Sequence, residues 1–256
     1  MDEHVRKDVE RATYNRTLNR ERPSFGSFWS PALYKAMMAA EFEPELERLA
    51  QQYLSGKKVL ILGAGAAEVE VAQRHTDRIW ALNLSENAVD ALQKSHPSVH
   101  SFVADAEALD ALEERFDVVY CKSILHHLHP IDAVLASIAR RLLPGGVLFV
   151  AMEPGLYNPF AALARRFTPS QSHTPGERPF VFSQFHRVAR EHFDVLYENQ
   201  HFLWSLLLPA LAKRAPVLEP VLDAALKPSL AAERGLRKLP LAPNLFWVMT
   251  GVYRVR

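Results

Sequence analysis

The chain has 256 residues, and its 30 Lys and Arg residues against 29 Asp and Glu residues give a formal net charge of +1. A hydrophobic share of 48% and a charged share of 23% are typical of a folded globular protein and exclude a disordered chain. Without a basic excess a nucleic-acid partner is not expected, and a single cysteine, Cys121, excludes an intramolecular disulfide and a cysteine-based zinc site.

The N-terminal part of the chain has a helical pattern. Residues 1–56 are predicted to form amphipathic helices, broken by a loop near Pro23, and we expect them to be a cap segment in front of a domain at residues 57–256. The first residues lack the apolar core of a secretory signal, and no apolar run reaches the roughly 18 residues of a membrane-spanning helix. We therefore expect a cytoplasmic protein.

From residue 57 onward, short apolar runs alternate with stretches of helical period. Runs that are apolar throughout indicate strands buried on both faces of a parallel sheet. Five such strands are predicted, at residues 59–62, 79–82, 99–103, 116–120 and 147–152. The pattern is typical of an α/β, Rossmann-like doubly wound fold.

The alternation loosens after residue 152. Residues 153–180 are rich in Pro, Ser, Thr and Arg and show no clear period, which predicts a long loop. Further along the chain the pattern predicts a helix at 183–191, a strand at 193–198, a largely helical stretch at 201–241 and a closing strand at 246–255.

A glycine-containing turn follows the first predicted strand. Gly63 and Gly65 have no Cβ, so the backbone can turn sharply there and approach a ligand closely at the start of a helix. Glu68 stands where dinucleotide-binding turns carry a small residue, and its carboxylate would repel a pyrophosphate but tolerate a sulfonium. Asn83 and Asp105 end the next two strand segments, where ribose hydroxyls and an adenine amino group could be bound. A tight turn without a ligand is the alternative.

Five segments together resemble the class I S-adenosylmethionine-dependent methyltransferases that act on small molecules. The resemblance covers about residues 57–152 and is carried by residues 59–65 (VLILGAG), 82–88 (LNLSENA), 103–106 (VADA), 116–128 (FDVVYCKSILHHL) and 142–148 (LLPGGVL). It implies S-adenosylmethionine as the cofactor and a seven-stranded sheet with a reversed final hairpin.

The same resemblance implies a set of cofactor-binding residues. Gly63, Ala64 and Gly65 would pass under the methionyl and ribose parts, and Asn83 would face the ribose hydroxyls. The remaining contacts would be Leu84 on the adenine face, Asp105 and Ala106 at the adenine edge, and the backbone of Cys121 and Lys122 beside the sulfonium.

The chain also departs from the pattern of the family. Ile61 and Asn83 replace residues that are commonly acidic, and Ala67 replaces a third glycine. Loss of a charge-assisted hydrogen bond at Asn83 costs on the order of 1–2 kcal/mol of binding free energy. The departures leave open a methyltransferase-fold protein that no longer methylates and acts as a binding partner or a non-methylating catalyst.

Histidines follow the fourth predicted strand, at the edge of the sheet where such folds bind ligands. Methyl transfer mainly requires that donor and acceptor be held close, and a base is needed only for a protonated acceptor. Because the family often carries a histidine here, His127 is the leading candidate base, with His126 and Glu153 as further candidates; helix packing is the alternative. No metal site is expected, because the neighbouring histidines cannot all face one ion and no carboxylate accompanies them.

Acceptor-binding residues are sought in the insertions at about 153–182 and 201–241 and in the cap. The candidates are Tyr14 in a lid helix, Phe25 and Trp29 in an aromatic patch, and His173 and Arg178 in the long loop, with packing or plain solvent exposure as the alternatives. Asn158-Pro159-Phe160 lies after the wrong strand for a base-methylating motif.

The apolar stretch after His201 could cover an acceptor, contact a membrane surface, form a homodimer face or be a buried helix. It favours a hydrophobic small-molecule acceptor. O-methylation is the preferred reaction, with N- or C-methylation as alternatives.

Overall fold

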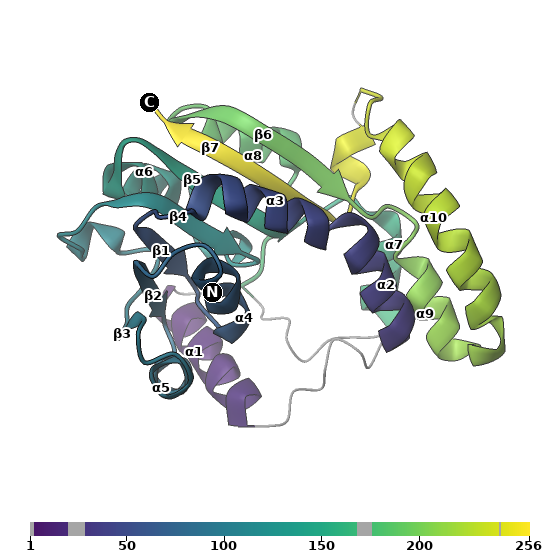
Figure 1. Cartoon of the computed structure of the whole chain (residues 1–256), viewed down its shortest axis with the longest axis horizontal. Helices are drawn as coiled ribbons and strands as arrows, with labels where there is room; N and C mark the ends of the chain where they lie inside the picture. The colour runs from purple at the N-terminus through teal and green to yellow at the C-terminus, as the bar shows by residue number, and fades with distance from the viewer. Residues whose placement is uncertain (1–2, 20–28, 168–175, 241) are drawn as a thin grey trace.

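Seven strands form one mixed sheet in the computed structural model, which describes residues 3–19, 29–167, 176–240 and 242–256 (Figure 1). Their order across the sheet is β3-β2-β1-β4-β5-β7-β6. The strands are β1 (Val59–Leu62), β2 (Ile79–Asn83), β3 (His100–Val103), β4 (Phe116–Lys122), β5 (Leu142–Pro154), β6 (Phe193–His201) and β7 (Val248–Val255). The first five strands are parallel, and β7 runs antiparallel to both β5 and β6. The predicted doubly wound sheet with a reversed final strand is confirmed.

The apolar strands are buried on both faces, as their sequence predicts. In β1, Val59 and Ile61 belong to one hydrophobic core, whereas Leu60 and Leu62 belong to the core on the opposite face. This alternation follows from the two-residue period of a strand. Because both faces need cover, helices must pack on each side of the sheet.

Ten α-helices surround the sheet in the part of the chain that the structure describes (Figure 1). They are α1 (Glu3–Asn19), α2 (Pro31–Glu41), α3 (Glu43–Leu54), α4 (Ala66–Gln73), α5 (Glu86–Ser95), α6 (Ile131–Arg141), α7 (Pro159–Phe167), α8 (Phe182–Ala189), α9 (Leu207–Arg214) and α10 (Glu219–Leu236). Helices α3 and α4 cover one face, and α6 and α8 cover the other. Helix α3 thus packs into the same core as the strands, although it lies in the segment predicted as a cap.

Helix α7 interrupts the segment that was predicted to be one long loop. Asn158 caps this helix, since its Oδ1 accepts a hydrogen bond from Ala161 N at 2.7 Å, and Pro159 takes the first helical position. The Asn158 side chain is buried, and its Nδ2 donates to the carbonyl oxygens of Phe202, Leu203 and Leu245. An asparagine followed by proline is a helix-start signal. The prediction of an irregular stretch overlooked it.

The apolar stretch after His201 is largely internal at its beginning. Phe202 and Leu206 are buried in the core, and α9 packs against α2 and α10. Exposed apolar side chains come later, with Val217 on the turn between α9 and α10 and Val221 in the first turn of α10. A role for this stretch at a membrane surface or in a homodimer stays a prediction. Among the described helices, none combines the length and the apolar character needed to cross a bilayer.

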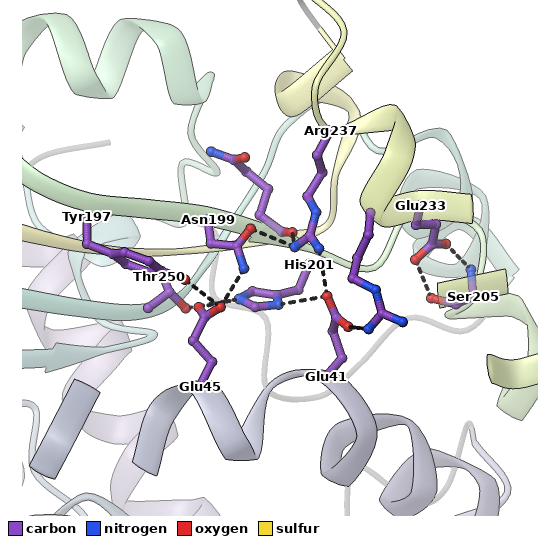
Figure 2. A network of polar contacts seen from close by, with 11 residues as sticks. Glu41, Glu45, Tyr197, Asn199, His201, Ser205, Glu233, Arg237 and Thr250 are labelled. Carbon is purple, nitrogen blue, oxygen red and sulfur yellow. Dashed lines mark hydrogen bonds and ion pairs between the residues drawn. The ribbon is translucent and has the colours of Figure 1, made fainter. Parts of the chain in front are cut away.

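A buried polar cluster ties the helices of the N-terminal segment to the edge of the sheet (Figure 2). The Glu45 carboxylate accepts hydrogen bonds from Tyr197 Oη at 2.7 Å, from His201 Nε2 at 3.0 Å and from Asn199 Nδ2. Glu41 forms ion pairs with Arg237 on the far side of His201, at 2.9 Å. Burial opposes the charge of Glu45, but the bonds from His201, Tyr197 and Asn199 outweigh it and hold the pKa of Glu45 below its usual value.

We expect Glu45→Gln to lower the free energy of unfolding by about 1–3 kcal/mol at pH 7, because it leaves buried donors poorly paired. Since the folded-state pKa of Glu45 is lowered, its stabilisation is present above the unfolded-state pKa and is lost as the pH falls through the folded-state value. The difference between wild type and variant in urea unfolding should therefore shrink below about pH 4. Glu47→Gln, at an exposed ion pair, is the control and should change little. An equal loss at both positions would contradict this reading.

Candidate active site

A cavity opens at the carboxyl ends of β1, β2 and β4. It is lined by Gly63, by residues 82–84 at the end of β2, by residues 104–107 after β3, and by Ser123, Ile124, His127 and Leu128 after β4. Lys7 and Glu10 of α1 complete the wall. This edge is where open α/β sheets bind their ligands.

The turn after β1 requires glycine at its first position. Gly63 has a φ of +64°, and a Cβ there would come within 2.7–2.8 Å of the Ile124 side chain. Glu68, three residues into the following helix, accepts a hydrogen bond from Gly65 N at 3.1 Å and pairs with Lys122 Nζ at 2.9 Å. Its negative charge is therefore compensated by this chain's own lysine, and the carboxylate caps α4.

Asn83 and Asp105 both line the cavity. Asn83 Nδ2 donates to Ala64 O at 2.9 Å, and its Oδ1 accepts from Ser85 N at 2.9 Å, so the side chain fixes the glycine turn. The Asn83 side chain has a second N–H donor on Nδ2 and a second lone pair on Oδ1, so it can still hydrogen-bond a ligand in the cavity. Asp105 Oδ1 accepts from Glu107 N at 2.8 Å, and Oδ2 pairs with Lys7 Nζ at 2.6 Å.

Helix α1 lies over the cavity and is held there by charged groups, which the sequence analysis did not single out. Arg6 donates to His127 O at 2.6 Å and pairs with Glu107 at 2.5 Å. Lys7 pairs with both Asp105 and Glu107. Arg6 and Glu10 are buried, which is rare for charged residues of an N-terminal helix. In the sequence, this role of α1 was indicated by a long helical segment that is rich in charged residues and poor in apolar ones.

Glu153 organises the turn η3 (Leu125–His127) after β4. Its side chain is fully buried and accepts hydrogen bonds from Ile124 N at 2.8 Å, Leu125 N at 2.9 Å and His126 N at 3.3 Å, and it lies 2.9 Å from His126 Nδ1. Burial would raise the pKa of Glu153, but His126 and these N–H groups outweigh it and lower the pKa. Glu153 does not line the cavity, so it positions the turn and His126.

His127 is the histidine that lines the cavity. Its Nδ1 lies 3.8 Å from Glu10 Oε1, and its Nε2 lies 4.0 Å from Glu177 Oε1. The His126 ring lies next to it, with ring centroids 4.1 Å apart. The expectation that no carboxylate accompanies these histidines was wrong, because the fold brings Glu10, Glu153 and Glu177 to them from distant segments.

The other predicted site residues lie in the cavity lining and the glycine turn, in the core, in the segment before α8, or outside the described residues. Leu84 and Ala106 line the cavity, and Ala64 and Gly65 belong to the glycine turn. Cys121 is buried in β4, where burial raises its pKa, and Trp29 packs against Trp247 in the core, away from the cavity lining. Arg178 N donates to His126 O at 2.9 Å. Phe25, His173 and the side chain of Tyr14 lie outside the described residues.

Comparisons with known proteins point in the same direction as this geometry. Residues 60–150 match the sequence model of the family described as "Methyltransferase domain". A ubiquinone biosynthesis O-methyltransferase of Coxiella burnetii is 27% identical over 185 residues, which are 70% of this chain and 74% of that protein. A malonyl-[acyl-carrier protein] O-methyltransferase of Chlorobium luteolum is 30% identical over 156 residues, 56% of this chain and 58% of that protein. This chain spans only a little over half the length of several of its curated relatives.

Among solved structures, the fold resembles the N-methyltransferase NodS from Bradyrhizobium japonicum in complex with S-adenosyl-L-homocysteine. The TM-score is 0.58 at 15% identity, and the match covers 97% of this chain and 99% of that one. At this identity the likeness concerns the fold alone. It includes the helices around the sheet as well as the strands, because nearly all of both chains is aligned.

We expect Glu153→Gln to lower the free energy of unfolding by about 3 kcal/mol, because one carboxylate oxygen becomes an NH2 group that faces at least one backbone N–H donor, and the buried negative charge is lost. Urea unfolding at pH 7 measures the effect. Glu191→Gln, at an exposed position, is the matched control and should change little. Equal unfolding midpoints for Glu153→Gln and wild type would contradict the positioning role.

Proposed function

Because this chain carries a methyltransferase domain of the class I fold and uses S-adenosylmethionine as its cofactor, we propose that it methylates an oxygen atom of a small, fairly apolar molecule. One observation carries the proposal. One cavity is lined both by the glycine turn, Asn83 and Asp105, which we assign as its nucleoside end, and by His127, which we assign as its acceptor end. Residues suited to a nucleoside and a residue suited to proton transfer therefore share one wall.

The residues at the first end fit the nucleoside part of the cofactor. Gly63 keeps the turn open to the cavity, Asn83 has hydrogen-bonding capacity for ribose hydroxyls, and Leu84 offers an apolar side chain for the adenine face. Asp105 provides a carboxylate at the adenine edge, which it shares with Lys7. When bound, S-adenosylmethionine supplies an electrophilic methyl carbon on a positively charged sulfur.

His127 is assigned to the activation of the acceptor. It faces the cavity from the turn after β4, and Glu153 and Arg6 fix that turn through its N–H and C=O groups. An oxygen acceptor with a neutral hydroxyl must lose its proton as it reacts, and a histidine beside it can assist. A neutral amine has no such need. The placement of His127 therefore favours oxygen over nitrogen.

The names of the relatives bear on which atom of the acceptor is methylated, and the cavity lining bears on how apolar the acceptor is. The relatives from Coxiella burnetii and Chlorobium luteolum are both named O-methyltransferases, whereas the structurally similar NodS is named an N-methyltransferase, so fold likeness does not decide the atom. Ile124, which also packs against Gly63, and Leu128 line the cavity and suit an apolar molecule.

We expect calorimetric titration to show binding of both S-adenosylmethionine and S-adenosylhomocysteine to the purified protein. Gly63→Ala should weaken both by about tenfold or more, because the new methyl group strains a backbone of positive φ and meets Ile124. Gly145→Ala, which adds a methyl group at another positive φ, of +76°, outside the cavity lining, is the matched control. No binding to the wild-type chain would favour the non-methylating alternative.

We expect His127→Ala to lower the rate of methyl transfer by about 10²-fold or more and to leave the affinity for S-adenosylhomocysteine nearly unchanged. The rate is measured with an acceptor found among apolar hydroxylated metabolites. His100→Ala, which removes an exposed histidine from β3, should retain full turnover. An unchanged rate in His127→Ala would remove this residue from acceptor activation.

A further inference from the structure

We propose that His126, His127 and Glu177 bind one divalent transition-metal ion at the acceptor end of the cavity. The proposal deepens the proposed function, since the ion would be the means by which His127 activates the acceptor. Binding of the ion itself can be tested without any acceptor or cofactor.

The three side chains already converge. One ligand atom from each lies within 4.8 Å of the others, although the residues come from the turn after β4 and from the segment before α8. Ligands around tetrahedral zinc, at about 2.1 Å from the metal, lie about 3.4 Å apart. Small rotations of the side chains, each of about an ångström, would complete the site.

The contacts behind the ligands are those of a metal site. His126 uses Nδ1 for its 2.9 Å contact with the buried Glu153, so Nε2 is the nitrogen left for a metal. His127 has Glu10 on its Nδ1 side, at 3.8 Å, and Glu177 on its Nε2 side. A carboxylate behind the distal nitrogen fixes the tautomer and raises the basicity of a metal-bound histidine. Glu153 is such a carboxylate for His126, whereas Glu10 lies on the Nδ1 side of His127 beyond hydrogen-bond distance.

The carboxylates around the histidines leave space between the charged groups. The 4.0 Å between His127 Nε2 and Glu177 Oε1 is longer than a hydrogen bond. Glu10 Oε1 is buried and accepts no hydrogen bond from the residues that the structure describes. Glu10, Glu153 and Glu177 therefore lie around the two histidines, and a dication held there would be attracted by their negative charge.

The ligand types indicate which metal would bind. Two imidazoles and one carboxylate suit zinc and its neighbours among the transition metals, whereas magnesium and calcium prefer oxygen ligands alone. Three protein ligands leave a fourth position open, as in catalytic zinc sites. Because His127 lines the cavity, that position would face the acceptor. A hydroxyl bound there has a lowered pKa and releases its proton to water before it reacts.

The test uses untagged full-length protein, treated with a chelator and then titrated with Zn²⁺ or with Co²⁺, whose visible absorption reports its ligands. We expect one equivalent to bind, and Glu177→Gln and His127→Ala each to weaken binding about tenfold or more. Glu70→Gln and His100→Ala, at exposed positions, are matched controls and should bind as wild type does. Cys121 is buried in the sheet and does not compete for the ion.

Two results would overturn the proposal: no stoichiometric binding by wild type, or binding in Glu177→Gln and His127→Ala as tight as in wild type. Glu177→Gln keeps the size of the side chain, so it guards against a folding defect in His127→Ala. Titration with S-adenosylhomocysteine in the presence of the chelator separates the two proposals. Cofactor binding without metal binding would overturn the metal site and leave the methyltransferase function standing.

Discussion

The buried carboxylate of Glu153 is the interaction on which the candidate site depends. Glu153 lies at the end of β5 and accepts hydrogen bonds from three consecutive backbone N–H groups of the turn after β4. The ends of the neighbouring strands β4 and β5 are therefore held together by one carboxylate. Ile124 begins that turn and touches Gly63 of the first loop. The cofactor end and the acceptor end are therefore built on a single hydrogen-bonded turn, whose formation requires an ionised group deep in the protein.

Two polar networks bear on the site in different ways. The cluster around Glu45 and His201 ties α3 to β6, and Glu41 of α2 pairs there with Arg237 at the end of α10 (Figure 2). The network of Arg6, Lys7 and Glu107 holds α1 to the cavity itself. The first is architectural and remote from the cavity lining, whereas the second places charged groups where ligands would bind.

The sequence allowed the parallel part of the sheet to be predicted from local signals, namely continuous apolar strands, and the reversed final strand from the resemblance to a family. Gly63, Asn83 and Asp105 were singled out as a glycine turn and two polar residues at strand ends, and the structure places all three in the lining of one cavity. The charged groups around the histidines could not be predicted, because Glu10 and Glu177 lie 117 and 50 residues from His127 in the chain. Long-range contacts of single charged residues leave no period in a sequence. Trp29 was assigned to the acceptor by residue type alone, and it packs in the core.

The attachment of helix α1 affects how ligands enter and leave the cavity. The helix is attached to the cavity wall mainly through ion pairs, and Lys7 occupies the same carboxylate that an adenine amino group would use. Ligand entry and helix attachment are then linked equilibria, each altering the free energy of the other. Because dissolved ions screen charged contacts, ionic strength becomes a control on access to the cavity, independent of any change in the ligand.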